Sequence, residues 1–217
     1  MSPTVYFFDM DHTLINNDCD VSWKDFLIAH GLAPEDDRRE AETFYDQYKR
    51  GQLDVPAFMR FQLREFIGRT PGEMAGLCQQ HFEEIVRSAI YPAARLEVAK
   101  ALASGAPVVL LTATNDVIAR PLADHLGIAT VEATRLAVVD GRFTGDIQGI
   151  YCVGEGKLAH ARDYCDHQAV DVSTACYYGD AVSDIPLLRA VGYPVVCNPG
   201  PELARAAHDN NWPVKRF

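Results

Sequence analysis

The chain has 217 residues, of which 48% are hydrophobic and 23% charged, a composition typical of a globular protein with one core domain and room for an insertion. Its formal net charge of -10 leaves no basic surplus to neutralise phosphates, so we expect no nucleic-acid partner. No apolar run approaches the roughly 20 residues of a membrane span, and no secretory signal is visible. The six cysteines form no C-x-x-C pair, so their thiols are expected to be reduced. We therefore expect a cytoplasmic protein without membrane contact, as a monomer or a homodimer.

The first elements predict a strand followed by a helical insertion. Residues 5–8 form an apolar run rich in aromatic and β-branched types, which is typical of a buried strand. From residue 21 to about residue 87 the hydrophobic spacing becomes helical, and Asp54 and Thr70 are plausible helix caps that precede prolines. No strand signal interrupts this stretch. We therefore predict a cap of four helices over residues 16–88, inserted after the first strand.

After the cap, strand patterns alternate with helix patterns. The Asp140-Gly141 pair predicts a hairpin between segments 135–139 and 142–144. Alternation of strands and helices implies a parallel sheet with right-handed crossovers. We therefore predict an α/β fold with a Rossmann-like, three-layer catalytic core formed by residues 1–15 and 89–217. The other expected strands cover residues 107–111, 128–131, 175–178 and 193–197, with 150–153 as a further strand or an extended lead-in.

Polar side chains stand at the carboxyl ends of the predicted strands. Asp9 and Asp11 follow the first strand, and side chains at i and i+2 of an extended segment project to the same side. Because ligands of open α/β sheets bind outside the carboxyl ends of the strands, these groups can converge on one ligand. The other members of the set are Thr112 after 107–111, Asp180 and Asp184 after 175–178, and Lys157 at a helix start behind Gly154 and Gly156.

Four short motifs follow one another along the chain, each at the end of a predicted strand or at the start of a helix. They are Asp9-Met-Asp11-His-Thr-Leu, Leu-Thr112-Ala-Thr-Asn, Gly154-Glu-Gly-Lys157 and Gly179-Asp180-Ala-Val-Ser-Asp184. The set resembles the haloacid dehalogenase-like (HAD) superfamily of phosphatases, and within it the branch that contains phosphoserine phosphatase, subfamily IB. The resemblance spans the whole chain, and the helical insertion lies where that branch carries its cap. It implies a phosphatase that hydrolyses a small phosphorylated metabolite.

The resemblance also implies a role for each group. Asp9 would be the nucleophile that forms an aspartyl-phosphate, and Asp11 would act as general acid and then as base. Thr112 would hydrogen-bond a phosphoryl oxygen, and Lys157 would neutralise charge on the phosphoryl group and on Asp9. The implied cofactor is Mg²⁺, which favours carboxylates, substrate oxygens and waters. Its ligands would be the Asp9 side chain, the Asp11 backbone carbonyl group and Asp180, with Asp184 in direct or outer support.

The same resemblance suggests substrate-binding residues. Asp18 stands where phosphoserine phosphatases carry an acid for the substrate ammonium, and Arg60 and Gln62 both fall near their carboxylate-binding arginine. Ala113 and Asn115, in the second motif, would lie beside the substrate, although this motif lacks the glycines of phosphoserine phosphatases. We therefore expect a phosphoserine-like or a histidinol phosphate-like substrate. Histidinol phosphate fits a site that offers an acid for the substrate amine but no clear arginine for a substrate carboxylate.

Other interpretations of the same residues exist. A phosphotransferase would pass the phosphoryl group from Asp9 to an alcohol instead of water. A non-catalytic phosphate-binding or regulatory module would keep the fold, although binding alone does not need Asp11. The segment from Gly154 to Ala159 also fits a dinucleotide fingerprint of the G-x-G-x-x-A kind. A calcium loop is excluded because Leu14 stands where that loop needs glycine.

Overall fold

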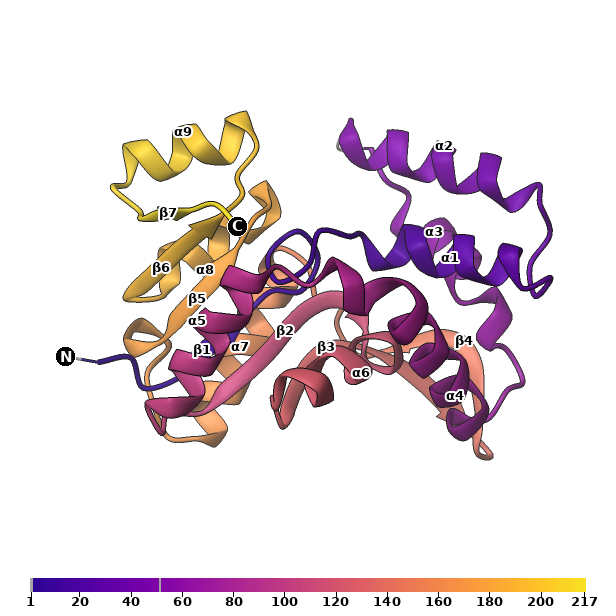
Figure 1. The fold of residues 1–217 in the computed structure, drawn as a ribbon, viewed down its shortest axis with the longest axis horizontal. Coiled ribbons are helices and arrows are strands. Elements are labelled where there is room, and N and C mark those ends of the chain that lie inside the picture. Colours follow the sequence, from indigo (N-terminus) through magenta and orange to yellow (C-terminus); the bar gives the residue numbers. More distant parts are fainter. Residues whose placement is uncertain (1, 51) are drawn as a thin grey trace.

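A seven-stranded sheet organises the fold of the computed structural model, which describes residues 2–50 and 52–217 (Figure 1). The strand order is β4-β3-β2-β1-β5-β6-β7. Among the described residues all strand pairs are parallel except that of β3 with β4. The chain order reverses at the central strand β1, and this switch point is where open α/β sheets bind ligands. The strands are β1 (Tyr6–Phe8), β2 (Val108–Asn115), β3 (Thr130–Val139), β4 (Arg142–Gln148), β5 (Cys176–Gly179), β6 (Tyr193–Cys197) and β7 (Val214–Lys215).

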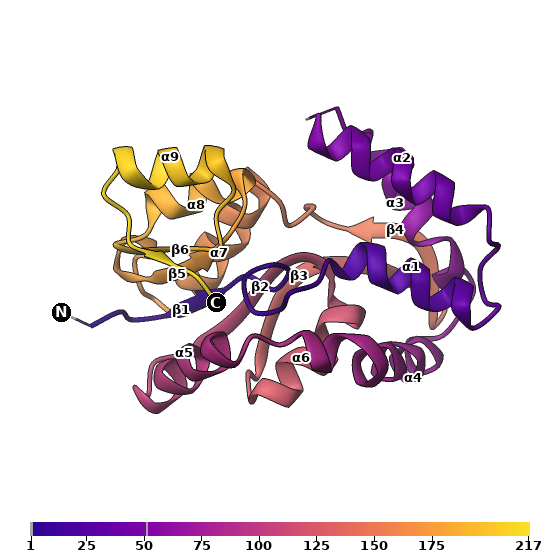
Figure 2. The same cartoon turned by 45° about the horizontal axis from the view of Figure 1, so that its top comes forward.

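Helices cover both faces of the sheet, so the core has three layers (Figures 1 and 2). Phe8 belongs to the apolar cluster on one face, together with Leu122 of α6. Phe7 belongs to the cluster on the other face, together with Leu158 of α7. Successive strand residues point to opposite faces, so a central strand reads as a continuous apolar run. This arrangement confirms the predicted α/β Rossmann-like fold. The helices are α5 (Pro92–Ala103), α6 (Asp116–Leu126), α7 (Glu155–His167), α8 (Ile185–Ala190) and α9 (Pro201–Asp209).

The segment between β1 and β2 is helical and packs against the end of the sheet. Asp18, Asp54 and Thr70 cap its helices α1, α3 and α4 through their side-chain oxygens. Its residues Trp23 and Met74 share one continuous apolar cluster with the sheet, and α1–α3 stand beside β4 in both views. Within the described residues, none of the helices is long and apolar enough to cross a membrane. The inserted helices are α1 (Cys19–Ala29), α2 (Asp37–Lys49), α3 (Val55–Gln62) and α4 (Pro71–His81), followed by irregular helical turns to Ala89.

Several local predictions were wrong. The helical spacing of apolar residues after Asp54 predicts one helix as far as Ile67, but α3 ends at Gln62 and gives way to a short 3-10 turn. Segments 128–131 and 135–139 belong to one strand, because β3 pairs with β2 along its first half and with β4 along its second. Residues 150–153 form no strand, but an irregular, bent segment between Gly149 and Gly154, which both have positive φ angles. The dinucleotide fingerprint therefore lacks the strand that it needs.

Candidate active site

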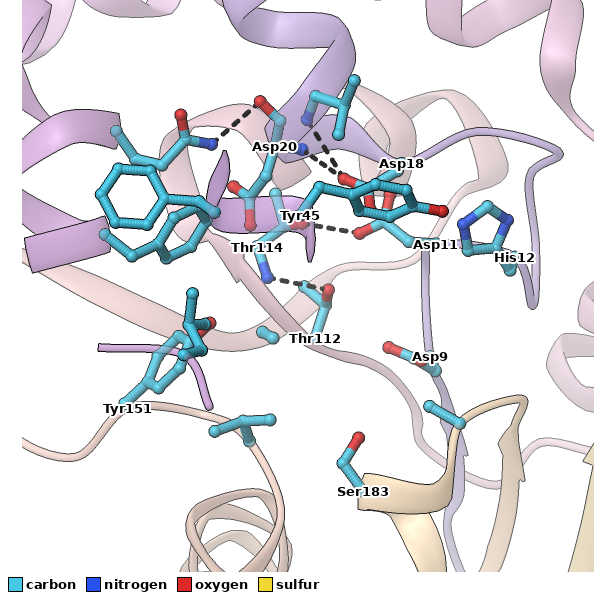
Figure 3. Close-up of a pocket in the computed structure, with 18 of the residues that line it drawn as sticks. Asp9, Asp11, His12, Asp18, Asp20, Tyr45, Thr112, Thr114, Tyr151 and Ser183 are labelled. Carbon is cyan, nitrogen blue, oxygen red and sulfur yellow. Dashed lines mark hydrogen bonds between the residues drawn. The ribbon is translucent and has the colours of Figure 1, made fainter. Parts of the chain in front are cut away.

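One cavity of about 310 Å³ lies between the carboxyl ends of the central strands and the inserted helices (Figure 3). Its core wall carries side chains from the last residues of β2 and from the segments that follow β1 and β5. Its other wall comes from the first three inserted helices, including Phe44 of α2 and Phe58 and Phe61 of α3. The predicted site residues that line this cavity are Asp9, Asp11, Asp18, Thr112, Ala113, Lys157 and Asp180.

Asp9 is fixed at the end of the central strand. Its backbone N–H group donates to the carbonyl oxygen of Tyr178, 2.9 Å away on β5. Its Oδ1 atom lies 3.1 Å from the Nζ atom of Lys157. Burial raises the pKa of Asp9, and the charge of Lys157 opposes that shift. An ammonium group in this position favours the charged, nucleophilic form of the carboxylate, against the larger effect of burial.

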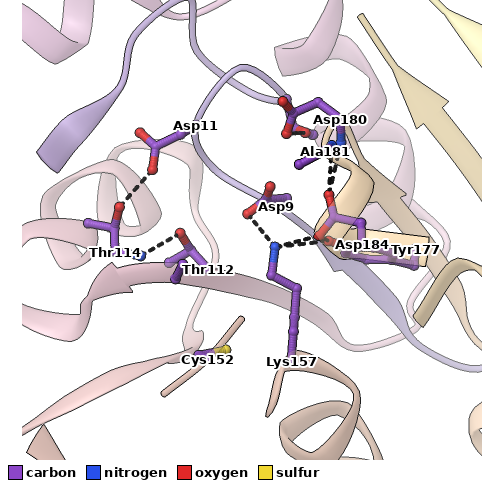
Figure 4. Close-up of polar contacts among 12 residues, drawn as sticks. Asp9, Asp11, Thr112, Thr114, Cys152, Lys157, Tyr177, Asp180, Ala181 and Asp184 are labelled. Carbon is purple, nitrogen blue, oxygen red and sulfur yellow. Dashed lines mark hydrogen bonds and ion pairs between the residues drawn. The ribbon is translucent and has the colours of Figure 1, made fainter. Parts of the chain in front are cut away.

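Lys157 is held by a buried network behind Asp9 (Figure 4). Its side chain is only 3% exposed, and its Nζ atom donates to Asp184 Oδ1 at 2.8 Å and to the Tyr177 hydroxyl at 3.1 Å. The Tyr177 hydroxyl in turn donates to Asp184 Oδ1 at 2.7 Å. Burial alone would lower the pKa of Lys157, but the charges of Asp184 and Asp9 outweigh it and raise that pKa. Lys157 therefore remains a cation.

Asp184 is saturated with hydrogen bonds. Its Oδ2 atom accepts from the backbone N–H groups of Asp180, at 3.1 Å, and Ala181, at 3.0 Å. A Cβ atom at Gly179 would lie 2.7 Å from the same oxygen, so only glycine fits there. Because both of its oxygens already have two partners, Asp184 is better placed to orient Lys157 and the Asp180 backbone than to ligate a metal directly.

Three carboxylates offer a site for a metal ion. One oxygen each from Asp9, Asp180 and Asp184 lies within 4.8 Å of the others. Burial and the nearby charges of Asp9 and Asp184 raise the pKa of Asp180 to about 9. A divalent cation would remove this repulsion, and hard oxygen ligands are those that Mg²⁺ prefers. The donor set therefore fits the expected cofactor.

Asp11 has the environment of a general acid. The backbone N–H group of Cys19 donates to its Oδ1 atom at 2.8 Å, and the Thr114 hydroxyl donates to its Oδ2 atom at 2.6 Å. Burial, assisted by the charge of Asp18, raises the pKa of Asp11 to about 8. At neutral pH in the metal-free protein this carboxyl group holds a proton that it could deliver to a leaving oxygen.

Of the remaining predicted site residues, some line the cavity and others do not. Thr112 and Ala113 line the cavity, and so does Asp18, whose Oδ1 atom also caps α1. Asn115 does not line it, because its side chain accepts from the Ile118 N–H group and caps α6. Arg60 is exposed on α3 and does not line it either.

The sequence interpretation did not single out three residues that the structure brings to the site. Thr114 stands two positions after Thr112, and the same-side rule for extended segments points to it. Tyr177 belongs to a uniform apolar run, so the sequence did not indicate that its hydroxyl group reaches the site. Asp20 lies on the first turn of α1 and lines the cavity. Its orientation depends on how that helix packs.

Comparison with known proteins now gives the class of the protein. The model of the haloacid dehalogenase-like hydrolase family matches residues 6–189, and the chain belongs to this family. A histidinol-phosphatase of Neisseria meningitidis is 32% identical over 97% of each chain. A phosphoserine phosphatase of Mycobacterium tuberculosis is 29% identical over 97% of this chain and 70% of its own. The chain is therefore a phosphatase of this family, and such phosphatases typically use Mg²⁺.

Solved structures show the same fold. A protein of unknown function from Bordetella pertussis Tohama I superimposes with a TM-score of 0.91 at 31% identity, over 99% of this chain and 98% of its own. A substrate-bound phosphoserine phosphatase superimposes with a TM-score of 0.68 at 17% identity, over 94% of this chain and 90% of its own. The second likeness shows the shared architecture alone.

Proposed function

We propose that this chain is a Mg²⁺-dependent phosphomonoester hydrolase that acts through an aspartyl-phosphate on Asp9. The observation that carries the proposal is the convergence of Asp9, Asp11 and Lys157 in one cavity, with Lys157 Nζ 3.1 Å from Asp9 Oδ1. In this view residues 16–88 are the cap, and residues 1–15 and 89–217 are the catalytic core.

The first step transfers the phosphoryl group to the enzyme. A carboxylate oxygen of Asp9 attacks phosphorus as the bond to the leaving oxygen breaks. Asp11 gives its proton to that oxygen, so the product leaves as an alcohol. Lys157 and the Thr112 hydroxyl stabilise the phosphoryl oxygens, because phosphoryl transfer depends mostly on position and charge.

The second step hydrolyses the intermediate. Asp11 takes a proton from water, the water oxygen attacks phosphorus, and the bond to Asp9 breaks to release inorganic phosphate. Mg²⁺ would be held by the Asp9 and Asp180 carboxylates and the Asp11 backbone carbonyl group, and it would neutralise charge on the phosphoryl oxygens. Asp184 would support this set through Lys157 and the Asp180 backbone.

The leaving group is proposed to be a small amino alcohol, as in histidinol phosphate. Asp18 lines the cavity and offers a carboxylate for an ammonium group. Among the described residues, no arginine lines the cavity, so a substrate carboxylate has no guanidinium partner there. The histidinol-phosphatase of Neisseria meningitidis matches over nearly its whole length, which supports the same choice.

The test is phosphate release from a panel of small phosphomonoesters, with and without Mg²⁺. We expect Mg²⁺-dependent release, and a loss of at least about 1,000-fold in Asp9→Asn, because the nucleophile is removed. The matched control is Asp163→Asn, whose side chain is 76% exposed on α7 and whose activity should match the wild type. Release that persists in Asp9→Asn would contradict the mechanism. A new phosphoester formed with an added alcohol would point to a phosphotransferase.

A further inference from the structure

Beyond the reacting groups, the cavity continues into an aromatic chamber under the inserted helices. Phe44 of α2 lies 5.6 Å from Phe58 and 5.3 Å from Phe61, measured between ring centroids. All three side chains line the cavity and come from the inserted helices, whereas Thr112 and Lys157 come from the core. Flat aromatic walls suit a planar or hydrocarbon group that stacks or packs on them.

This chamber also carries negative charge without a matching cation. Asp18 and Asp20 both line it, and Lys157 is the one lysine or arginine among the described lining residues. Lys157 is already engaged by Asp9 and Asp184. Figure 3 shows the Asp20 side chain directed towards Thr114, into the cavity. A carboxylate in such a place is stabilised by a ligand that brings a positive charge.

Asp18 and Asp20 differ in the hydrogen bonds that their carboxylates already make. Asp18 Oδ1 accepts from the backbone N–H groups of Asp20, at 3.0 Å, and Val21, at 3.1 Å, so this one oxygen of the carboxylate is engaged in capping α1. Asp20 is held by its backbone, because its N–H group donates to Asp18 and its carbonyl oxygen accepts from Gln62 Nε2 at 2.9 Å. The backbone is fixed at both ends, and the Asp20 carboxylate takes no part in the helix cap.

An unmet acceptor lies beside Asp20, whose carboxylate is also within hydrogen-bonding reach of the Gln62 side chain. Gln62 lines the cavity, is only 5% exposed, and its Oε1 atom has no hydrogen-bond partner among the described residues. A buried amide oxygen without a donor is costly unless a ligand supplies one. The Asp20 carboxylate and Gln62 Oε1 together provide acceptors for N–H groups, next to aromatic walls.

We propose that Asp20 is a specificity-determining residue that binds a cationic nitrogen of the leaving alcohol, while the rest of that group packs on Phe44 and Phe58. The substrate class is a phosphomonoester whose alcohol carries a protonated nitrogen and a planar ring. This inference rests on the proposed hydrolase function, because it assigns the leaving group to the chamber.

The experiment compares two esters that differ in the nitrogen atoms. Histidinol phosphate carries an amine and an imidazole ring, and 3-phenylpropyl phosphate carries a ring alone. The measured quantity is the ratio of kcat/KM for the first ester to that for the second. In Asp20→Asn we expect this ratio to fall about 10- to 100-fold, mainly through KM of histidinol phosphate, as for loss of a hydrogen bond to a charged group. The matched control is Asp25→Asn, on the exposed side of the same helix, which should keep the wild-type ratio.

The outcomes separate this inference from the proposed function. An unchanged ratio in Asp20→Asn, or a wild-type ratio of one, would overturn the role of Asp20 while leaving the hydrolase intact. Absence of phosphate release from both esters by the wild type would instead reject the proposed function. Calorimetric binding of histidinol and 3-phenylpropanol then still tests the chamber. Tighter binding of histidinol that weakens in Asp20→Asn supports it, and equal binding of the two alcohols rejects it.

Discussion

The two walls of the cavity are held by different physical means. On the core wall, Lys157 and Asp184 are positioned by short hydrogen bonds that leave neither carboxylate oxygen of Asp184 unpaired. On the inserted wall, Phe44, Phe58 and Phe61 are positioned by ring contacts. Directional bonds fix atoms to fractions of an ångström, whereas apolar packing tolerates substitutions of similar volume. We therefore expect the reaction to depend on the first wall and the choice of leaving group to depend on the second.

The inserted wall has one rigid anchor of its own. Lys24 of α1 is 1% exposed, and its Nζ atom lies 2.7 Å from Glu65 Oε2 and 3.7 Å from Asp37 Oδ2. The same atom donates to the Phe61 carbonyl oxygen at 3.2 Å and lies 4.3 Å above the Phe61 ring. Arg64 pairs with Asp37 from the other side. Lys24 thus ties α2 and the end of α3 to α1.

Among changes that keep the nucleophile Asp9, the largest expected effect comes from removing the cation of the core wall. Lys157→Met leaves the carboxylates of Asp9 and Asp184 without their ammonium partner and should lower kcat about 100- to 1,000-fold. Calorimetry should still detect Mg²⁺ binding, because the carboxylates remain. The control is Lys100→Met, an exposed lysine on α5. Activity within threefold of the wild type would show that this wall does not carry the reaction.

The next effect tests the anchor of the inserted wall. Lys24→Met removes the buried cation between Asp37 and Glu65 and leaves them only the half-exposed Arg64 as a partner, and breaking such a buried pair typically costs about 3 to 5 kcal/mol. We expect a fall of about 3 kcal/mol in the free energy of unfolding, measured by urea denaturation, with Lys100→Met again as the control. A fall below about 1 kcal/mol, as is usual for surface pairs, would mean that packing alone holds this wall.

A third effect links the metal to pH. Burial raises the pKa of Asp11 to about 8 and of Asp180 to about 9, above their ordinary value of 3.8. The folded, metal-free protein therefore retains protons that the unfolded chain has released, and it should lose stability as pH rises from about 4 to about 9. Mg²⁺ competes with these protons, so the stabilisation that it gives should increase across this window.

Thermal denaturation at pH 6, 7 and 8, with and without Mg²⁺, measures this stabilisation. At a Mg²⁺ concentration roughly 100-fold above Kd it should approach about 3 kcal/mol. Asp180→Asn should lose most of it, whereas the exposed Asp209→Asn should not. Histidines such as His81 titrate with and without the metal, so the difference between the two curves isolates the carboxylates. An increment that stays constant with pH would reject this linkage.

The difference between the core wall and the inserted wall also explains how much of the site could be predicted from the sequence. Parallel strands end at one edge of a sheet, so the run before Asp9 and the run before Asp180 were enough to predict convergence. The α/β fold and its family membership followed from such patterns and were confirmed. The irregular segment at residues 150–153 could not be predicted from its apolar run, because the positive φ angles of Gly149 and Gly154 bend the chain on either side of it.

Contacts between distant elements could not be predicted from the sequence for a different reason. Tyr177 and Asp184 lie seven residues apart, yet their hydrogen bond depends on how β5 leads into the following turn. Lys24 meets Glu65 across 41 positions. No local propensity encodes these pairs, so nothing in the sequence distinguished Lys24 from other helix residues. The strand β7 is only two residues long and carries no periodic signal of its own.

The smallest expected effect separates fine positioning from charge on the core wall. Tyr177→Phe removes the hydroxyl that donates to Asp184 and accepts from Lys157, but it keeps the direct 2.8 Å ion pair between them. Loss of one such hydrogen bond is worth about 1 kcal/mol, so kcat should fall roughly fivefold with KM unchanged. The control is Tyr178→Phe, which removes a hydroxyl that bonds Glu97 on the other face of the sheet. An unchanged kcat would mean that the ion pair alone orients Lys157. A fall as large as that of Lys157→Met would mean that the ammonium group cannot keep its place without the hydroxyl.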